Sequence, residues 1–209
     1  MRKIGILAIG LLLFGQTAGA ATWSIIGFSV KPQDVAAVTA AADALMSSAA
    51  GKAFPGRLFL QVNVADGDNP ATHAFVPVYN TAAEREASGA TFRADPAWAT
   101  FQKTMTAKTE PVSNVMYRTV QRWGDISDDD TGQVFLSSVV AGGITPVSHV
   151  ISVGEESEAA IEATEKIFQG SADWATYLAA SQKAADYLGN NMVRTMKTWG
   201  VSLDEATAQ

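Results

Sequence analysis

The chain has 209 residues, of which 47 % are hydrophobic and 17 % charged, and its formal net charge is −6. This composition is typical of a folded globular protein and excludes an intrinsically disordered one. The acidic balance argues against a nucleic acid or an anionic membrane surface as partner, because both require a basic footprint. The sequence contains no cysteine, so its stability must come from a hydrophobic core rather than from disulfides.

Residues 1–20 are predicted to be a secretory signal peptide. Arg2 and Lys3 precede an apolar run over Ile4–Phe14, and Ala18-Gly19-Ala20 then supplies a small-x-small cleavage site before Ala21. The apolar run is too short to span a bilayer as a mature helix. Loss of the two basic residues takes the formal net charge from −6 to −8. We therefore expect a periplasmic or secreted protein that has no membrane contact after signal removal.

The next residues predict alternating strands and helices. Residues 58–64 alternate apolar and polar side chains, as in a half-buried strand, and Asp95-Pro96 is a typical helix start. Gly51 ends the helix that Pro32 begins. In chain order we predict a strand over Trp23–Val30, a helix over Pro32–Ala50, strands over Leu58–Val64 and Thr72–Tyr79, a helix from the Asn80-Thr81 cap to Ala90, a helix from Asp95 to Lys108 and a strand over Val112–Trp123.

The second half of the chain repeats most of the first. At an offset of 76 residues, positions 56–124 fall on positions 132–200 without a gap, and 21 of the 69 pairs are identical. The period is too long and the copies are too few for a solenoid, so the sequence predicts a duplicated domain or two halves of one pseudo-symmetric domain. We place a first unit at 21–124, a shorter second copy at 132–200 and a tail at 201–209.

The second copy lacks the front end of the first. The strand and helix predicted over residues 23–50 have no counterpart, and the polar linker Gly124–Gly132 is too short to hold both. With its front end, the first unit has the order β-α-β-β-α-β of the split βαβ or ferredoxin-like arrangement. The predicted fold class is α+β, with antiparallel sheets covered by helices in two tandem ferredoxin-like halves.

This architecture resembles the dimeric α/β-barrel superfamily, which includes the antibiotic-biosynthesis-monooxygenase-like domains. The similar features are the strand order, the turn over 67–73 that leads into a strand, and an aromatic-bearing helix before the last strand. They cover most of 22–124 and, less completely, 132–200. The resemblance implies ferredoxin-like units that pair face to face, as dimers or as tandem copies. It also implies activities that range from cofactor-free oxygenation of phenolic substrates to haem handling and isomerisation, and it transfers no catalytic residue.

His73 and His149 are the sequence's two histidines, and they occupy equivalent positions in the two copies. Histidine titrates near neutral pH, so each is a candidate catalytic base or ligand at the mouth of a pocket. Alternatively, each ring hydrogen-bonds the turn that precedes its strand. Two histidines without clustered carboxylates or cysteines do not predict a metal site, and we expect no metal or cofactor.

The last strand of each copy carries a second group of candidates. Because side chains alternate across a strand, Asn114, Met116 and Arg118 share one face, and three positions of that face recur 76 residues later. An arginine with an amide neighbour can bind a carboxylate or phenolate. Alternatively, the arginine covers apolar surface or pairs with a glutamate, for which Glu86 and Glu162 match between the copies. The candidate ligand-binding residues are Asn114, Arg118, Asn190, Arg194, Trp98 and Trp174, the two tryptophans being equally compatible with a core role.

Three functions are compatible with these residues. The first is a cofactor-free oxygenase or isomerase with a small-molecule pocket in each half, in which His73 and Arg118 line one cavity. The second is a periplasmic protein that binds a small molecule in the same pockets without turnover. The third is an interaction protein whose duplicated sheets form an interface. The sequence leaves open whether the protein is a monomer or a homo-oligomer.

Overall fold

A computed structural model of the chain describes residues 21–65, 69–123, 133–142, 147–155, 157–184 and 191–201. The predicted signal peptide, the whole Gly124–Gly132 linker, Asn190 and the tail from residue 202 lie outside the described residues. The elements are β1 (Thr22–Val30), η1 (Pro32–Asp34), α1 (Val35–Met46), α2 (Ala49–Lys52), β2 (Arg57–Ala65), β3 (His73–Tyr79), α3 (Ala82–Ala94), α4 (Pro96–Lys108), β4 (Thr109–Trp123), β5 (Gln133–Gly142), β6 (His149–Gly154), α5 (Glu158–Gly170), α6 (Ala172–Ala184) and β7 (Met192–Gly200).

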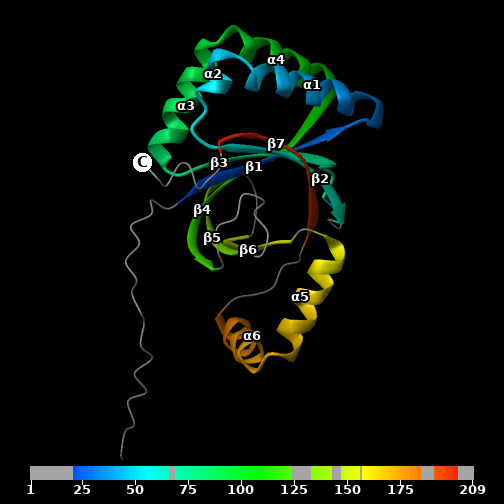
Figure 1. Ribbon diagram of the computed structural model, residues 1–209, viewed down its shortest axis with the longest axis vertical. Helices are drawn as coiled ribbons and strands as arrows, with labels where there is room; N and C mark the ends of the chain where they lie inside the picture. The colour runs from blue at the N-terminus through cyan, green and yellow to red at the C-terminus, as the bar shows by residue number, and fades with distance from the viewer. Residues whose placement is uncertain are drawn as a thin grey trace, which may run out of the picture.

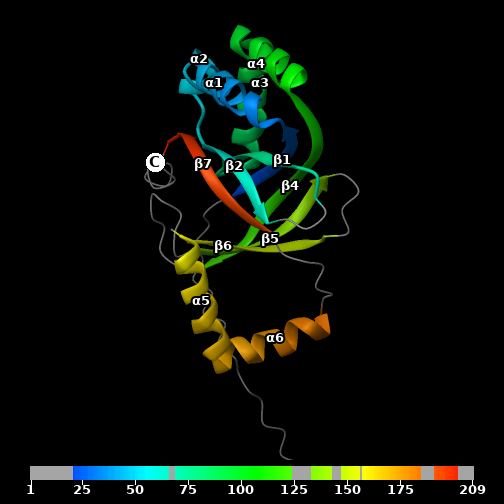
Figure 2. The ribbon, with the colours of Figure 1, turned by 90° about the vertical axis from the view of Figure 1, so that its right-hand side faces the viewer.

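The strands form one seven-stranded sheet in the order β6-β5-β4-β1-β3-β2-β7 (Figure 1). All neighbouring strands are antiparallel. The central order β4-β1-β3-β2 is that of a ferredoxin-like unit. The sheet curls, so that β5 and β6 lie below β1 and β3 (Figures 1 and 2). The fold is therefore α+β with an antiparallel sheet, as the sequence predicts.

Both copies contribute to the same sheet. β5, β6 and β7 are the second-copy equivalents of β2, β3 and β4. β5 pairs with β4, and β7 pairs with β2, so each end of the first unit is extended by a strand of the second. In the part of the chain that the structure describes, β6 and β7 are the two ends of the sheet.

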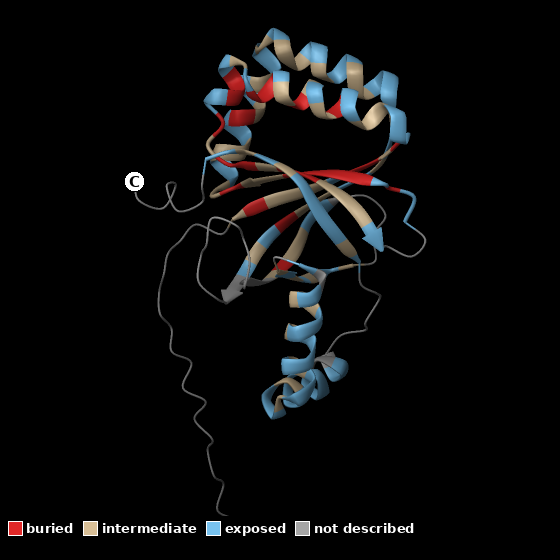
Figure 3. Cartoon of the chain, turned by 45° about the vertical axis from the view of Figure 1, so that its right-hand side comes forward, coloured by how far each residue is buried: buried red, intermediate tan, exposed pale blue. Residues whose placement is uncertain are grey.

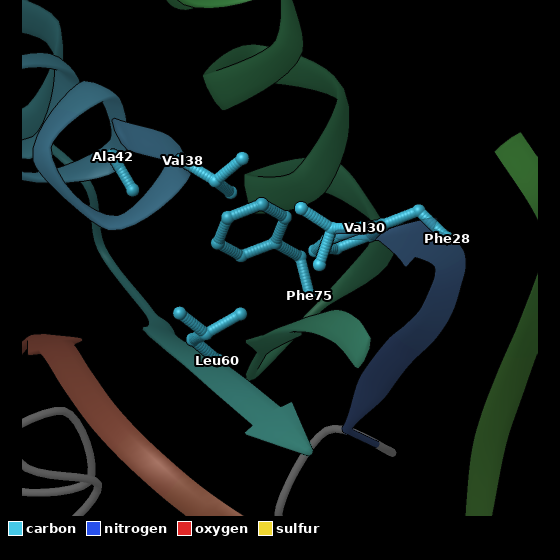
Figure 4. Close-up of a cluster of buried hydrophobic side chains, with 6 residues drawn as sticks. All are labelled: Phe28, Val30, Val38, Ala42, Leu60 and Phe75. Carbon is cyan, nitrogen blue, oxygen red and sulfur yellow. The ribbon is translucent and has the colours of Figure 1, made fainter. Parts of the chain in front are cut away.

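One face of the sheet is covered by helices of the first copy. α1 packs on this face and α4 packs beside it, which leaves a core cluster between the helices and the sheet (Figures 1 and 4). Phe75 of this cluster contacts Phe101 of α4, with 5.8 Å between ring centroids. Burial of each such side chain contributes about 1.5–3 kcal/mol. The fully buried cluster consists of Phe28, Val30, Val38, Ala42, Leu60 and Phe75.

Side-chain caps stabilise the first turns of α3 and α4. Thr81 and Glu84 form a complete capping box at the start of α3. Asp95 caps α4 by accepting a hydrogen bond from the Ala97 amide at 2.9 Å, and it also accepts one from the Ala50 amide at 3.0 Å. Asp95 thereby joins α4 to α2 as well as starting its own helix.

The helices of the second copy lie at the opposite end of the molecule from α1–α4 (Figure 1). α5 and α6 pack on each other through Phe168 and Trp174, whose ring centroids are 4.7 Å apart. Most of their surface is exposed (Figure 3). Ile167 is 70 % exposed and Tyr177 is 43 % exposed. The equivalent helix of the first copy, α4, packs against α1, and the second copy has no helix equivalent to α1.

Candidate functional site

The concave face of the sheet, turned away from α1 and α4, carries an aromatic pair. β1 pairs with β4 so that Trp23 lies opposite Tyr117. Their rings stack with centroids 4.3 Å apart and an interplanar angle of 17°. The Trp23 indole N–H donates a hydrogen bond to the Ser137 hydroxyl oxygen of β5 at 3.3 Å. The curl of the sheet thus connects side chains 114 positions apart in the sequence.

The pair is buried on one side and accessible on the other. Ser137 is completely buried and Tyr117 is 6 % exposed, whereas Trp23 is half-buried. Burial raises the pKa of the Tyr117 phenol above its ordinary value. The phenol therefore stays protonated at neutral pH and can donate a hydrogen bond, but it cannot act as a base.

A cation lies in the same transverse row of the sheet. Trp23 pairs with Val78 of β3, and Val78 pairs with Arg57 of β2, so Arg57 is two strands away from Trp23 on the same face. Two strand spacings correspond to about 10 Å between backbones. The Arg57 guanidinium lies over the Phe59 ring, 5.0 Å from its centroid. The row therefore combines a planar aromatic surface, a hydroxyl group and a positive charge.

His73 lies on the other face of the sheet, next to the core. It is 8 % exposed, and its ring stacks on Phe28 with 6.1 Å between centroids. Its Nδ1 is 2.9 Å from the Thr72 hydroxyl oxygen, a contact with the residue that precedes its strand. Burial lowers the pKa of His73 below its ordinary value, so the ring is neutral at pH 7. These contacts agree with the packing alternative for this histidine.

The structure does not bring His73 and Arg118 together. Both side chains are on the helix-covered face, but His73 lies opposite Phe28, at one end of β1, and Arg118 lies opposite Thr22, at the other. The separation of six positions along β1 corresponds to roughly 20 Å of strand. Asn114 and Arg118 do share one face, as their spacing predicts, and both are exposed.

The second-copy candidates lie in different surroundings from their equivalents. His149 is exposed, with Nδ1 3.1 Å from the Ser148 hydroxyl oxygen, and Arg194 is exposed on β7. Asn190 lies outside the described residues. Val193 stands at the position equivalent to Tyr117, and the second copy has no equivalent of β1 to supply a tryptophan like Trp23. The aromatic pair of the concave face is therefore not duplicated.

Trp98 and Trp174 pack within their own helix pairs. Trp98 contacts Phe92 at 6.0 Å and Phe101 at 5.6 Å between centroids, and it is half-buried in the helix layer. Trp174 stacks between Phe168 and Tyr177. Neither tryptophan lies on a strand of the concave face. Both environments fit the core role that the sequence leaves open for them.

The sequence alone does not predict that Trp23, Tyr117 and Ser137 come together on the concave face. Trp23 and Tyr117 stand at alternate strand positions that are as compatible with solvent as with a site. Ser137 has no distinguishing pattern at all. Their association depends on the pairing of β4 with β5 across the two copies, which no local signal predicts.

An open groove of about 580 Å³ separates α1 from α4 on the outer side of the helix layer. Its lining consists mainly of alanine and threonine, with Phe101 and Lys108. Among the described residues, no group of three or more histidine, cysteine, aspartate or glutamate side chains is placed to hold a metal ion. No described helix is long and apolar enough to cross a membrane.

Comparison with known proteins gives a structural match without a sequence match. The chain is similar to a crystal structure described as a putative monooxygenase from Fusobacterium nucleatum subsp. nucleatum, with a TM-score of 0.55 and 8 % sequence identity. The match covers 88 % of this chain and 96 % of the other. No protein-family model matches the sequence, and no curated protein matches it significantly. At this identity the likeness establishes the fold, a monooxygenase-like α+β arrangement, and not the reaction.

Proposed function

We propose that this protein binds a planar, mostly apolar small molecule on the concave face of its sheet. The observation that carries the proposal is the stacked Trp23–Tyr117 pair, held by a fully buried Ser137 and half-open to solvent on the Trp23 side. Stacked rings with a fixed geometry offer a flat surface to another ring at low conformational cost. Among the described residues, no helix covers the exposed part of the Trp23 ring on the concave face. A ligand could therefore contact this ring.

The charge in the row defines the chemical class of the ligand. Arg57 is buried on the same face as Trp23 and lies over the Phe59 ring, so it adds a positive charge that a ligand with a carboxylate or phenolate group complements. An aromatic acid or a phenol combines both requirements. This class also includes the phenolic substrates that the superfamily resemblance implies.

Binding is better supported than turnover. The Tyr117 phenol is held protonated by burial, and His73, the buried histidine, is on the other face. If the protein is an enzyme, cofactor-free oxygenation or isomerisation of a phenolic ligand is a reaction class that the superfamily resemblance implies. The substrate would then have to supply the electrons itself, and oxygen uptake with a phenolic ligand would reveal it.

The experiment is a titration of the mature protein with 2-naphthoate, followed by tryptophan fluorescence. We expect saturable binding that Trp23→Ala weakens about tenfold, equivalent to about 1.4 kcal/mol, because the variant removes one stacking partner. Trp98→Phe, in the helix layer, is the matched control and should bind as the native chain does. Arg57→Gln should reduce the preference for 2-naphthoate over the neutral 2-naphthalenemethanol. Binding that is absent, or unaffected by Trp23→Ala, contradicts the proposal.

An interaction protein is the second candidate function, and a separate observation favours it. The second copy leaves two sheet edges and the apolar side chains beside them without a partner among the described residues.

A further inference from the structure

Among the described residues, no strand lies between the two ends of the sheet, and this place is called the vacant position. In the first copy, β1 lies between β3 and β4 and pairs with both. Their second-copy equivalents are β6 and β7, and these are the two ends of the sheet (Figures 1 and 2). The strand that would lie between β6 and β7 is therefore the equivalent of β1, which the second copy lacks.

The residues that recur most clearly between the copies line this position. In the first copy His73 lies opposite Phe28 of β1, and Met116 and Arg118 lie opposite Ser24 and Thr22. The repeated histidine and the repeated Met-x-Arg sequence are thus the neighbours of β1 on its two sides. Their equivalents, His149, Met192 and Arg194, line the vacant position.

Main-chain groups of β6 face the vacant position and pair with no other strand that the structure describes. The Val139 amide donates to the Ser148 carbonyl at 2.9 Å, which fixes the alternation of the β5–β6 ladder. Val150 and Ser152 therefore bond to β5. The amides and carbonyls of His149, Ile151 and Val153 point to the open edge. By the same reasoning, the Val201 amide bonded to the Gly56 carbonyl directs the main-chain groups of Thr198 and Gly200 to the open edge of β7.

The β6 edge has none of the usual devices that block strand addition. The strand His149–Gly154 contains no lysine, arginine, acid or proline. Ile151 is 47 % exposed and Val153 is 43 % exposed, on the face that α1 and α4 cover in the first copy. An uncharged edge beside apolar side chains fits an uncharged strand with alternating apolar residues. β1 itself, TWSIIGFSV, has this composition.

We propose that the place between β6 and β7 accepts an extended, uncharged segment of another polypeptide, which completes an eight-stranded ring. This chain's own β1 cannot move there, because Phe28 and Val30 are buried in the core at 2 % and 7 % exposure. The nine residues between β4 and β5 are too few for the missing strand and helix. Neither β1 nor the β4–β5 linker can supply the strand, which makes a partner its proposed source, and this inference does not depend on the ligand proposed above.

The test uses a synthetic peptide of residues 21–30 with a charged solubilising tail, added to the mature full-length chain. We expect saturable binding by fluorescence anisotropy, with slowed hydrogen exchange at the Ile151 and Val153 amides. A peptide with proline in place of Ile26 is the matched control, because proline cannot donate the central main-chain bond. It should not bind.

Two variants of the protein locate the site. Ile151→Pro removes an edge donor at the centre of β6 without removing a β5–β6 bond, and should weaken peptide binding about tenfold or more. Val153→Pro should bind nearly normally, because Pro77 stands at the equivalent position and β1 pairs on both sides of it. Circular dichroism and thermal melts verify that both variants fold.

Three results would overturn the inference. The first is no saturable binding of the native peptide. The second is equal binding to both proline variants. The third is a stable homodimer, seen by sedimentation, that Ile151→Pro dissociates and that excludes the peptide, because the edge is then occupied by a second copy.

Discussion

His73 is a buried, neutral imidazole whose ring packs on Phe28. Burial disfavours the charged form and lowers its pKa below the ordinary value of about 6.5. A group whose pKa is lower in the folded than in the unfolded chain contributes stability that is present above the unfolded pKa and is lost as pH falls through the folded one. The folded state is therefore less stable at pH 5 than at pH 7.5.

Replacing this histidine should remove part of that pH dependence. We expect His73→Gln to narrow the difference between urea midpoints measured at pH 7.5 and pH 5, because the variant has no ring to protonate. His149→Gln, at the exposed equivalent position, is the control and should retain the native difference. An unchanged pH profile in His73→Gln would show that another group causes the acid sensitivity.

The repeated residues illustrate what the sequence can and cannot reveal at this scale. The alternation of the last strand correctly places Asn114 and Arg118 on one face. A residue can recur in both copies for two reasons. Each copy can use it in a functional site, or each copy can need it to pack beside an equivalent strand. Pairing of β4 with β1 supports the second reason for Asn114 and Arg118. The register of that pairing cannot be predicted from the local sequence of either strand.

At the scale of elements, the caps decide where the helices of the first copy begin. Asp95 accepts backbone hydrogen bonds from Ala50 and Ala97, in that order of effect, and these lower the pKa of its carboxyl group. Ser171 has the equivalent position in the second copy and accepts a bond from the Trp174 amide at 3.3 Å. Asp95 joins two helices of the packed layer, whereas Ser171 lies between helices that contact mainly each other.

The two caps should therefore differ in their effect on global stability. We expect Asp95→Ala to lower the urea midpoint at pH 7 clearly and Ser171→Ala to leave it nearly unchanged, because only the first cap belongs to the main core. The effect of Asp95→Ala should diminish below about pH 4, where the native carboxylate protonates and loses its advantage. Equal losses for both variants would show that α5 and α6 unfold with the rest of the molecule.

Local signals predicted several elements of the first copy. Alternation, the Asn80-Thr81 cap and the Asp95-Pro96 start predict elements that differ from β2, α3 and α4 mainly at their ends. The single helix predicted over Pro32–Ala50 is divided into η1, α1 and α2, and Gly51, its predicted end, lies inside α2. The same signals could not predict where α5 and α6 lie. Their position depends on the absence of a second-copy helix equivalent to α1. The sequences of α5 and α6 contain no signal of that absence.

At the scale of the whole molecule, the Asp43 carboxylate in the first copy forms hydrogen bonds with the last strand of the second copy. Asp43 of α1 accepts hydrogen bonds from the Trp199 indole at 2.8 Å and from Lys197, both on β7. The hydrogen bond from the Lys197 ammonium has the largest effect in lowering the pKa of Asp43. Burial opposes it, and the hydrogen bond from Trp199 lowers the pKa by a smaller amount than burial raises it. These bonds hold the last strand against the helix layer of the first copy.

Loss of the hydrogen bonds to Asp43 should weaken the packing of β7 against α1. We expect Asp43→Ala to lower the unfolding free energy by about 1 kcal/mol at pH 7, since it removes an exposed ion pair and one further hydrogen bond. The loss should shrink as pH falls below about 3.8, where the native carboxylate protonates. Lys166→Ala, which breaks the fully exposed pair with Glu162, is the control and should change little. A pH-independent loss would point to packing rather than charge.

The shape of the whole sheet follows from the truncation of the second copy. Seven strands from two unequal units leave one position open, and the absence of the front end from the second copy is visible in the sequence alone. What the sequence could not show is that β4 and β2 would take β5 and β7 as neighbours, so that the missing strand becomes a gap between two edges.

Residue-resolved hydrogen exchange of the chain from residue 21 onward, without added peptide, tests this arrangement most directly. The account predicts slow exchange at the Val150 and Ser152 amides, which bond to β5, and fast exchange at the intervening Ile151 and Val153 amides, which face the open edge. Slow exchange at all four amides would contradict it, because the edge of β6 would then already have a partner.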